Sequence, residues 1–421
     1  MRPVRGDNLP ARWCVVDDVP MTISTVAFDP FSAEFFNDPY PIYRRLRDEA
    51  PVFRSEDLGF YALSRHEDVA VAFKDFETFS SARGVTLDQV STGEVVKDPL
   101  VQFMDPPAHR RMRGLVNKVF TPRAIAAQEP IVRATIDRYF SRLDPDAFDV
   151  VADFSAYFPV EVITTMLGVP EEDRQSVRHF QDLVMEREAG ATTMSEAGKK
   201  AVEENGLLYY NIIQQRRAEP RDDMISALIA VEVERGDGTT TKLDDVEIVG
   251  FCMLLGGAGA ETVTKLMGSA MVLFSKRRDQ WEQLRADRTK ISDAVEEVLR
   301  FDGPVQYDCR YSLKELQVHG ATIPAHKTVM LLPASANRDE RAFTDPDTFD
   351  INRDRAEAQN LGFGYGIHSC LGAALARMES KIALDHLLDV LPWFEIATDQ
   401  LRRVSMTNVN GYANVPVRAS R

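Results

Sequence analysis

The stretch that decides the fold of this chain is FGYGIHSCLG, which spans residues 363–372. It places a single cysteine, Cys370, in a glycine-rich loop directly ahead of a helical pattern, AALARME, over residues 373–379. Glycine at three positions of the loop removes side chains, so the backbone can approach a flat object closely. Backbone N–H groups at the start of the following helix favour negative charge on the cysteine sulfur. The alternative interpretation is a buried structural cysteine after a tight turn.

A thiolate in a loop shielded from water needs a cation, and haem iron is the obvious candidate. The pattern F-G-x-G-x-H-x-C-x-G, with Phe363, His368, Cys370 and Gly372 in its defined positions, resembles the haem-binding loop of the cytochrome P-450 family. The resemblance implies haem b (iron protoporphyrin IX) as the cofactor. It also implies that Cys370 is the axial ligand of the haem iron and that Phe363, His368 and Gly372 contact the haem.

The rest of the chain fits one large domain. The chain has 421 residues, of which 44% are hydrophobic, and no Gly/Ser/Pro-rich linker or charge block divides it. Helical patterns dominate residues 122–301 and strand patterns lie on both sides of them, so we predict a mainly α fold with minor β sheets (α+β). The resemblance covers nearly the whole chain from Phe28 and implies the single-domain cytochrome P-450 fold. We therefore expect an N-terminal extension without a packed role at 1–27 and a haem-thiolate monooxygenase domain at 28–421.

Charge and cysteine content exclude several classes of function. The formal net charge of −15 argues against nucleic acid and anionic membrane surfaces as partners. The four cysteines show neither the spacing of a zinc site nor the density of a disulfide framework, which fits a reducing cytoplasm. No apolar segment resembles a signal peptide, and the longest uncharged apolar run, over residues 249–260, is too short to span a bilayer. We expect a cytoplasmic protein, which we take to be a monomer.

A second chemical feature is GGAGAET, residues 256–262, inside a long apolar helical pattern. Glycine inside a helix costs about 1 kcal/mol relative to alanine, so either a neighbour packs closely here or the helix opens locally. By itself, the segment fits a core helix with small packing residues equally well. It resembles the family's A-G-x-[D/E]-T oxygen-activation motif, with glutamate where aspartate is commoner. The resemblance implies that Glu261 and Thr262 are catalytic and deliver protons.

A third feature is Glu297-Val298-Leu299-Arg300, in which Glu297 and Arg300 share a helix face. The generic interpretation is a solvated surface pair. The segment resembles the family's E-x-x-R pair, which joins a second arginine downstream, and Phe349-Asp350-Ile351-Asn352-Arg353 resembles that element. Arg353 is therefore the candidate third member of a structural cluster that serves folding and haem retention.

Haem also carries two propionates, which need cationic partners. His109 and Arg113 are four residues apart, and they match the places where similar bacterial proteins have a His and an Arg for this purpose. Arg310, in a strand-like segment, and His368, two residues before Cys370, match two further propionate contacts. For His109 alone, a surface histidine is the simpler interpretation.

The resemblance also implies a substrate pocket. Its predicted lining residues are Val85, Leu87, Leu255, Ala258, Val305, Gln306, Asn408 and Tyr412. The apolar members favour a hydrophobic ligand. Gln306 and Asn408 could orient a polar group of that ligand, but they fit equally well as turn and strand-edge residues that are satisfied by backbone groups.

The reaction that the resemblance implies is insertion of one oxygen atom of O2 into a hydrophobic small molecule, terpenoid, steroid, fatty-acid or polyketide-like. Electrons would come from NAD(P)H through a reductase and a ferredoxin. Positive charge gathers on one helical segment of this acidic chain, and we expect the ferredoxin to bind there, around Arg110, Arg111 and Lys118, with Arg123 nearby. Two alternatives remain: a peroxide-driven peroxygenase, against which Glu261 and Thr262 count, and a non-catalytic haem sensor or carrier.

Overall fold

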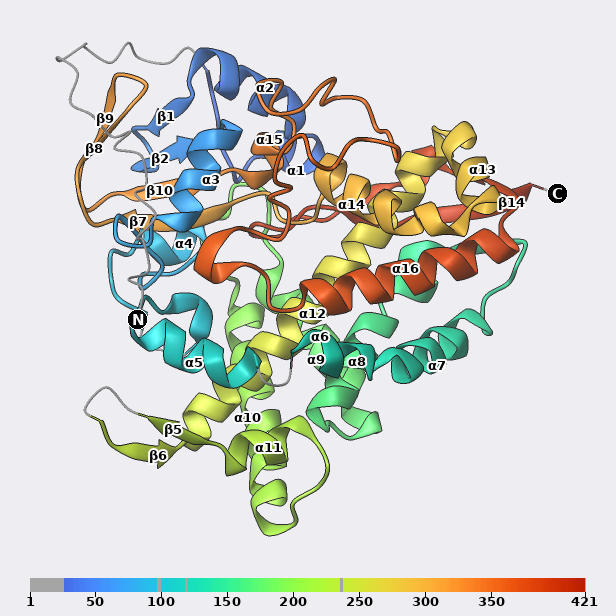
Figure 1. The fold of residues 1–421 in the computed structure, drawn as a ribbon, viewed down its shortest axis with the longest axis horizontal. Helices are drawn as coiled ribbons and strands as arrows, with labels where there is room; N and C mark the ends of the chain where they lie inside the picture. The colour runs from blue at the N-terminus through green and yellow to red at the C-terminus, as the bar shows by residue number, and fades with distance from the viewer. Residues whose placement is uncertain (1–25, 97–99, 118–119, 235–237, 421) are drawn as a thin grey trace, which may run out of the picture.

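A computed structural model of the chain describes residues 26–96, 100–117, 120–234 and 238–420. Helices make up most of the molecule, and most of the short strands gather on one side of it (Figure 1). The prediction of a mainly α fold with minor β sheets is confirmed. Residues 1–25 lie outside the described ranges. Val26, two residues ahead of the predicted domain start, is already buried in the core.

The longest helix, α12 (Asp245–Ser275), runs through the middle of the helical part (Figure 1). Asp244 and Glu247 form a capping box that satisfies backbone N–H groups at its start. Buried residues occur on most sides of α12 rather than on one stripe, because other helices surround it. These are α8 (Phe158–Leu167), α9 (Arg174–Met185), α10 (Glu196–Ala218), α11 (Met224–Ala230), α13 (Arg278–Ala286), α14 (Ile291–Asp302) and α16 (Ala373–Val390).

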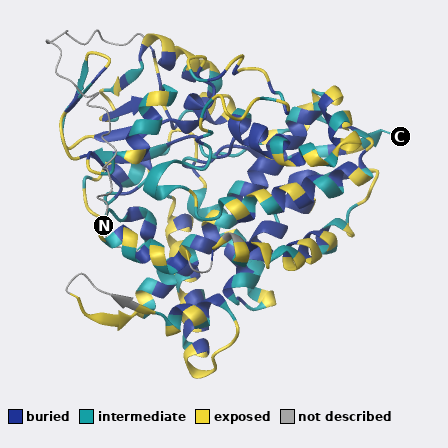
Figure 2. Ribbon diagram, viewed as in Figure 1, coloured by how far each residue is buried: buried dark blue, intermediate teal, exposed yellow. Residues whose placement is uncertain are grey.

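Three further helices complete the helical part and lie farther out. Buried and exposed residues alternate along outer helices such as α7, whose inner face packs on α8 and α16 (Figure 2). The three helices are α5 (Ala108–Asn117), α6 (Pro122–Ala126) and α7 (Glu129–Phe140).

A five-stranded sheet forms the other side of the molecule, with strand order β1-β2-β10-β7-β3. Strands β2 and β10 pair in parallel and the other neighbours pair antiparallel. The strands are β1 (Val52–Ser55), β2 (Phe60–Leu63), β3 (Phe79–Ser80), β7 (Asp308–Ser312) and β10 (Thr328–Leu331). The helices of this part are α1 (Ala33–Asn37), α2 (Tyr40–Glu49), α3 (His66–Lys74), α4 (Leu87–Val90) and α15 (Pro333–Ala336).

Small sheets close the periphery. One joins β4 (Ala147–Asp149), β14 (Pro416–Ser420) and β11 (Trp393–Ile396). Three two-stranded sheets are formed by β5 (Glu232–Glu234) with β6 (Thr240–Lys242), β8 (Leu316–Val318) with β9 (Ala321–Ile323), and β12 (Arg402–Arg403) with β13 (Tyr412–Asn414).

Two helical stretches, Val150–Leu167 and Asp245–Ser275, are long and apolar enough to cross a membrane by length and composition. Within the most apolar part of each, 67% and 56% of the residues are buried inside the protein. Their apolar character is therefore accounted for by packing in the protein core.

Candidate active site

The Cys370 loop lies directly before α16, and glycines fix its path. The Cys370 N–H donates to the Phe363 carbonyl oxygen at 2.8 Å, which closes the loop on itself. Gly366 has a φ of +75°, and a Cβ there would lie 2.6 Å from the Phe73 carbonyl oxygen of α3. A side chain at Gly366 would therefore be strained and would clash. At Gly372 the backbone is not strained. A Cβ there would lie 4.0 Å from Cys370 Sγ, so a side chain at this position would contact the sulfur.

The Cys370 side chain is accessible, although protein surrounds it densely. Burial raises the pKa of the Cys370 thiol above its ordinary value. The backbone N–H groups of Gly372 and Ala373 and the guanidinium groups of Arg113 and Arg377 act in the opposite direction and favour the thiolate. The expected contribution of the helix start is therefore present.

Two histidines meet beside this loop. The rings of His109, on α5, and His368 have their centroids 4.4 Å apart. Both ring nitrogens of His109 and Nε2 of His368 are buried without a hydrogen-bond partner. Burial is the largest cause that lowers the pKa of both imidazoles, that of His368 to about 2. Unpaired buried polar atoms in a native protein call for a partner that is not part of the chain.

Two arginines complete the same neighbourhood. Arg113, one turn after His109, donates from Nη2 to the Ser369 carbonyl oxygen at 2.6 Å. Arg310, on β7, is 3% exposed and close enough to His368 to lower its pKa. The structure thus brings all four predicted propionate partners together from α5, β7 and the Cys370 loop. Two guanidinium groups and three unpaired imidazole nitrogens beside an accessible cysteine fit a haem with two carboxylates.

The glycines of α12 face neighbouring helices. A Cβ at Gly256 would lie 2.3 Å from Tyr209 Oη of α10, and one at Gly257 would lie 2.4 Å from Gln181 Oε1 of α9. Because α12 is continuous over Asp245–Ser275, the glycines allow close packing and do not mark an open break. Of the two alternatives given for these glycines, the structure shows the close packing of neighbours and not a local opening of the helix.

Glu261 and Thr262 point in different directions. Thr262 is half-buried and its Oγ1 donates to the Ala258 carbonyl oxygen at 3.1 Å. Glu261 is 3% exposed, and its Oε2 lies 3.0 Å from the Lys265 ammonium. It also forms a hydrogen bond with the side chain of Asp182 on α9. The sequence interpretation missed both partners. Lys265 was detectable from its i,i+4 spacing, whereas Asp182 carries no such signal because it lies on another helix.

The predicted structural cluster is assembled and buried. Arg300 donates to both oxygens of Glu297 at 2.8 Å, and Arg353 Nε lies 3.4 Å from Glu297. Glu297 and Arg300 are 4% and 3% exposed, which rules out the solvated surface pair. Arg300 also donates to the carbonyl oxygens of Asn337 and Pro346 at 2.8 and 2.9 Å.

The polar residues of the predicted pocket are occupied by neighbouring groups. Gln306 is 1% exposed and donates to the Gly303 carbonyl oxygen at 2.9 Å, while Asn408 donates to the Tyr307 carbonyl oxygen at 3.0 Å. These bonds match the alternative in which the two amides support the backbone.

The apolar residues of the predicted pocket divide into two groups. Leu87 packs in the core beside the five-stranded sheet, and Tyr412 packs in the helical core against Gly268. Val85 and Val305 remain half-buried, Leu255 is 8% exposed, and Ala258, one turn from Thr262, is exposed.

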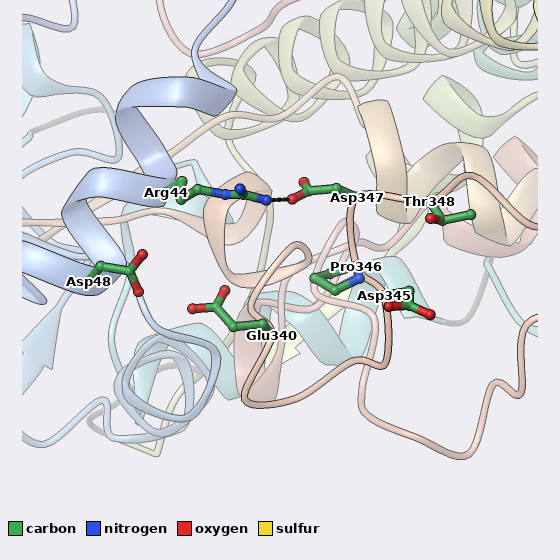
Figure 3. Close-up of a pocket in the computed structure, with 7 residues that line it drawn as sticks. All are labelled: Arg44, Asp48, Glu340, Asp345, Pro346, Asp347 and Thr348. Carbon is green, nitrogen blue, oxygen red and sulfur yellow. Dashed lines mark hydrogen bonds and ion pairs between the residues drawn. The ribbon is translucent and has the colours of Figure 1, made fainter.

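A separate surface cavity of about 390 Å³ lies between α2 and the loop at residues 340–348 (Figure 3). Its walls are mostly charged, and the ion pair of Arg44 with Asp347 crosses it. None of the predicted site residues lines this cavity.

The chain resembles known proteins over most of its length. A sequence model of the family described as cytochrome P-450 matches residues 59–416. Cytochrome P-450 123 of Mycobacterium tuberculosis is 41% identical over 397 residues, which cover 93% of this chain and 96% of the relative. Vitamin D(3) 25-hydroxylase of Pseudonocardia autotrophica is 36% identical over 403 residues, covering 94% and 97%.

Solved structures agree with the sequence relatives. A mutant of P-450 EryK in complex with erythromycin B has a TM-score of 0.82 at 30% identity, covering 91% of this chain and 96% of that chain. The family match includes the Cys370 loop, the α12 motif and the Glu297 cluster. The chain therefore belongs to the cytochrome P-450 family of haem-containing monooxygenases.

Proposed function

We propose that this chain inserts one oxygen atom of O2 into a hydrophobic small molecule of the terpenoid, steroid, fatty-acid or polyketide-like class. The observation that carries the proposal is the accessible Cys370 thiol beside three unpaired imidazole nitrogens. When bound there, thiolate-ligated haem supplies the activation of dioxygen. A relative named as a vitamin D(3) hydroxylase and a neighbour solved with erythromycin B support a bulky, largely apolar substrate.

The residues of the site divide the work. Arg113 and Arg310 would hold the two haem propionates by charge, and His109 and His368 would hold them by hydrogen bonds. Phe363 and Gly372 shape the loop, and the Arg377 guanidinium lies 4.6 Å from the centre of the Phe363 ring. Thr262 and Glu261 deliver protons to the reaction. Glu297, Arg300 and Arg353 hold the fold on which the loop depends.

The substrate pocket that we propose is apolar. Its walls include Val85, Leu255, Ala258 and Val305, of which Ala258 lies one helical turn from Thr262. We assign Leu87, Gln306, Asn408 and Tyr412 to packing and backbone support, because their contacts lie within the protein.

Electrons reach the site from NAD(P)H through a reductase and a ferredoxin that binds around α5. Arg110 is exposed and Arg111 half-buried on that helix, and Arg113 of the same helix contacts the residue before Cys370. Lys118, predicted for the same surface, lies outside the described residues. We further propose that residues 28–421 act as one domain in a monomeric cytoplasmic protein.

The carbon monoxide spectrum of the ferrous protein tests the role of Cys370. A thiolate opposite carbon monoxide shifts the Soret band strongly to the red, so Cys370→Ser should lose this band. Cys252→Ser and Cys309→Ser, at buried positions, should keep it, as should Cys14→Ser, whose position lies outside the described residues. A normal band in Cys370→Ser would overturn the assignment.

Two measurements test the substrate class and the electron source. Titration of a compound panel should change the haem spin state with terpenoids, steroids, fatty acids or macrolides and not with small polar compounds. Turnover with NAD(P)H, reductase and ferredoxin should exceed turnover with hydrogen peroxide. The reverse order would favour a peroxygenase, and substrate that never accelerates oxygen consumption would favour a sensor or carrier.

A further inference from the structure

The glycine at position 257 of α12 makes room for a polar side chain of α9. A Cβ at Gly257 would lie 2.4 Å from Gln181 Oε1, 2.8 Å from Gln181 Cδ and 3.2 Å from Gln181 Nε2. The Gln181 amide therefore occupies the space on α12 that the side chain of any larger residue would need. Gly257 stands one residue ahead of the segment that resembles the oxygen-activation motif, so that motif does not account for it.

Val177, one turn before Gln181 on α9, meets α12 at the preceding glycine. Val177 is fully buried, and a Cβ at Gly256 would lie 3.2 Å from its Cγ1. Residues four apart share a helix face, so Val177 and Gln181 form the side of α9 that packs on α12. Gln181 is only half-buried. The contact between the two helices is thus apolar and closed at Val177 but polar and accessible at Gln181.

The Gln181 amide makes no hydrogen bond with the part of the chain that the structure describes. Gln175 of the same helix shows the contrast, because its amide donates to Tyr139 Oη at 3.3 Å and to Glu161 Oε2 at 3.4 Å. Removing an unpaired amide from water costs free energy that an apolar side chain of the same size would not. Gln181 therefore packs poorly, yet it offers both a donor and an acceptor.

The amide lies beside the side of α12 that the proposed pocket uses. Leu254, Ala258 and Thr262 recur every four residues, and all three stay accessible on a helix that other helices surround. Gly257 directly precedes Ala258 and stands five residues before Thr262. At a rise of about 1.5 Å per residue, Gly257 and Thr262 are about 7.5 Å apart along the helix axis.

We propose that Gln181 determines specificity: its amide, lying on Gly257, binds a hydroxyl or carbonyl group of an otherwise apolar substrate. A carbonyl oxygen accepts from Nε2, and a hydroxyl can bond to either end of the amide. The carbon that is oxidised then lies about 7.5 Å from the bound oxygen, at the Thr262 end of the pocket. This inference rests on the proposed monooxygenase function and narrows its substrates to hydrophobic molecules that already carry an oxygen group.

Pairs of compounds that differ in one oxygen group test the proposal in the haem-loaded protein. The probes are androstane and androstanol, cedrane and cedrol, hexadecane and hexadecanol, and a macrolide and its deoxy analogue. Titration of the haem spin state gives the two Kd values of each pair. For at least one pair, the preference for the oxygenated member should fall about three- to tenfold in Gln181→Met, which keeps the side-chain length but has no amide.

Gly257→Ala tests the geometry, because it displaces the amide without removing it. The new Cβ would lie 2.4 Å from Gln181 Oε1, so the amide must move and the preference should fall as it does in Gln181→Met. The two changes together should lower the preference no further than either change alone. Gly206→Ala on α10 is the matched control, since its Cβ would meet Met253 Sδ at an ordinary 3.7 Å and should leave the preference unchanged.

Thermal unfolding separates recognition of substrate from packing of the helices. Gln181→Met should keep or raise the wild-type Tm, because an unpaired amide is lost. A preference that stays unchanged in both Gln181→Met and Gly257→Ala would overturn the proposal, and a lower Tm would then assign Gln181 to packing, while the proposed substrate class would stand. If no compound of any pair changes the spin state of the wild type, the proposed substrate class fails and this inference fails with it.

Discussion

Neighbouring residues on α12 face different surroundings, because successive side chains on a helix point about 100° apart. Thr262 lies on the same side as Ala258 one turn earlier, and both are at least partly accessible. Glu261 is turned into the protein, where Lys265 and Asp182 hold its carboxylate. The hydroxyl and the acid are adjacent in sequence, yet only the acid is tied to another helix.

Removal of the Thr262 hydroxyl should separate oxygen activation from binding. Thr262→Ala should bind haem and substrate normally but divert electrons to hydrogen peroxide, because the hydroxyl proposed to relay protons is lost. The measurement is product formed per NAD(P)H consumed, with Thr262→Ser expected to retain most of the wild-type ratio. An unchanged ratio in Thr262→Ala would assign Thr262 to helix packing, through its bond to the Ala258 carbonyl.

Asp182 should also make the stability of the fold depend on pH. Its pKa rises from an ordinary value of 3.8 to about 8 in the folded protein. Between these pH values Asp182 is ionised in the unfolded chain but still protonated in the folded chain. The contribution of Asp182 to the free energy of unfolding is therefore fully present below about pH 4 and is lost as pH rises to about 8. In thermal unfolding, the Tm of Asp182→Asn should therefore fall less between pH 5 and pH 8 than the Tm of the wild type does. Parallel Tm curves would contradict the raised pKa.

At the scale of elements, α14 connects the core to the segment that precedes the Cys370 loop. Asn360 donates to the Glu296 carbonyl oxygen at 3.0 Å, and Leu361 donates to Asn337 Oδ1 at 2.8 Å. Asn337 in turn has its carbonyl held by Arg300. The Glu297 cluster therefore positions the chain a few residues before Phe363 without reaching Cys370 itself.

Glu297→Ala should destabilise the fold strongly, because it leaves Arg300 buried without its carboxylate. The free energy of unfolding should fall by about 3–5 kcal/mol, the range for one partner lost from a buried ion pair. Haem retention should fall with it. Denaturant titration measures the change, and Glu204→Ala is the control, since Glu204 pairs with Lys200 at 3.3 Å on the exposed side of α10. A loss under about 1 kcal/mol would place the cluster with ordinary surface pairs.

At the scale of the whole molecule, the proposed ferredoxin surface places exposed arginines on an acidic protein. The chain carries a net charge of −15. Arg110 is nevertheless exposed on α5, the helix that reaches Ser369 through Arg113, and Arg123 is exposed on α6, the next helix in the chain. Complementary charge mainly raises the rate of association, and salt weakens it.

Charge reversal on this surface should slow electron delivery. Arg110→Glu or Arg111→Glu should reduce the rate of reduction by an acidic ferredoxin several-fold at low salt and leave substrate affinity unchanged. Arg418→Glu is the control, because Arg418 is exposed on β14, on the opposite side of the molecule from α5 (Figure 1). The docking surface is elsewhere if the α5 variants are reduced as fast as wild type, or if salt does not slow the wild type.

The sequence by itself determined the parts of this protein that are local in the chain. Three features are of this kind: the Cys370 loop, the glycine segment before Thr262 and the i,i+3 pair of Glu297 and Arg300. In each of them the residues are a few positions apart in one turn or helix, and the regular geometry of that element brings them next to each other. Resemblance to a known family added Arg353 and the four propionate candidates. The structure places Arg353 beside Glu297 and brings the four propionate candidates together beside the Cys370 loop.

Only the tertiary structure decided which surface each of these residues meets. The glycines of α12 face Tyr209 and Gln181, and Glu261 meets Asp182, because helices distant in sequence pack there. The sequence likewise did not decide the hydrogen-bond partners of Gln306 and Asn408, since an amide can donate to a ligand or to a backbone carbonyl equally well. Contacts of this kind depend on how side chains from separate elements fill one space, and no spacing within a single element encodes them.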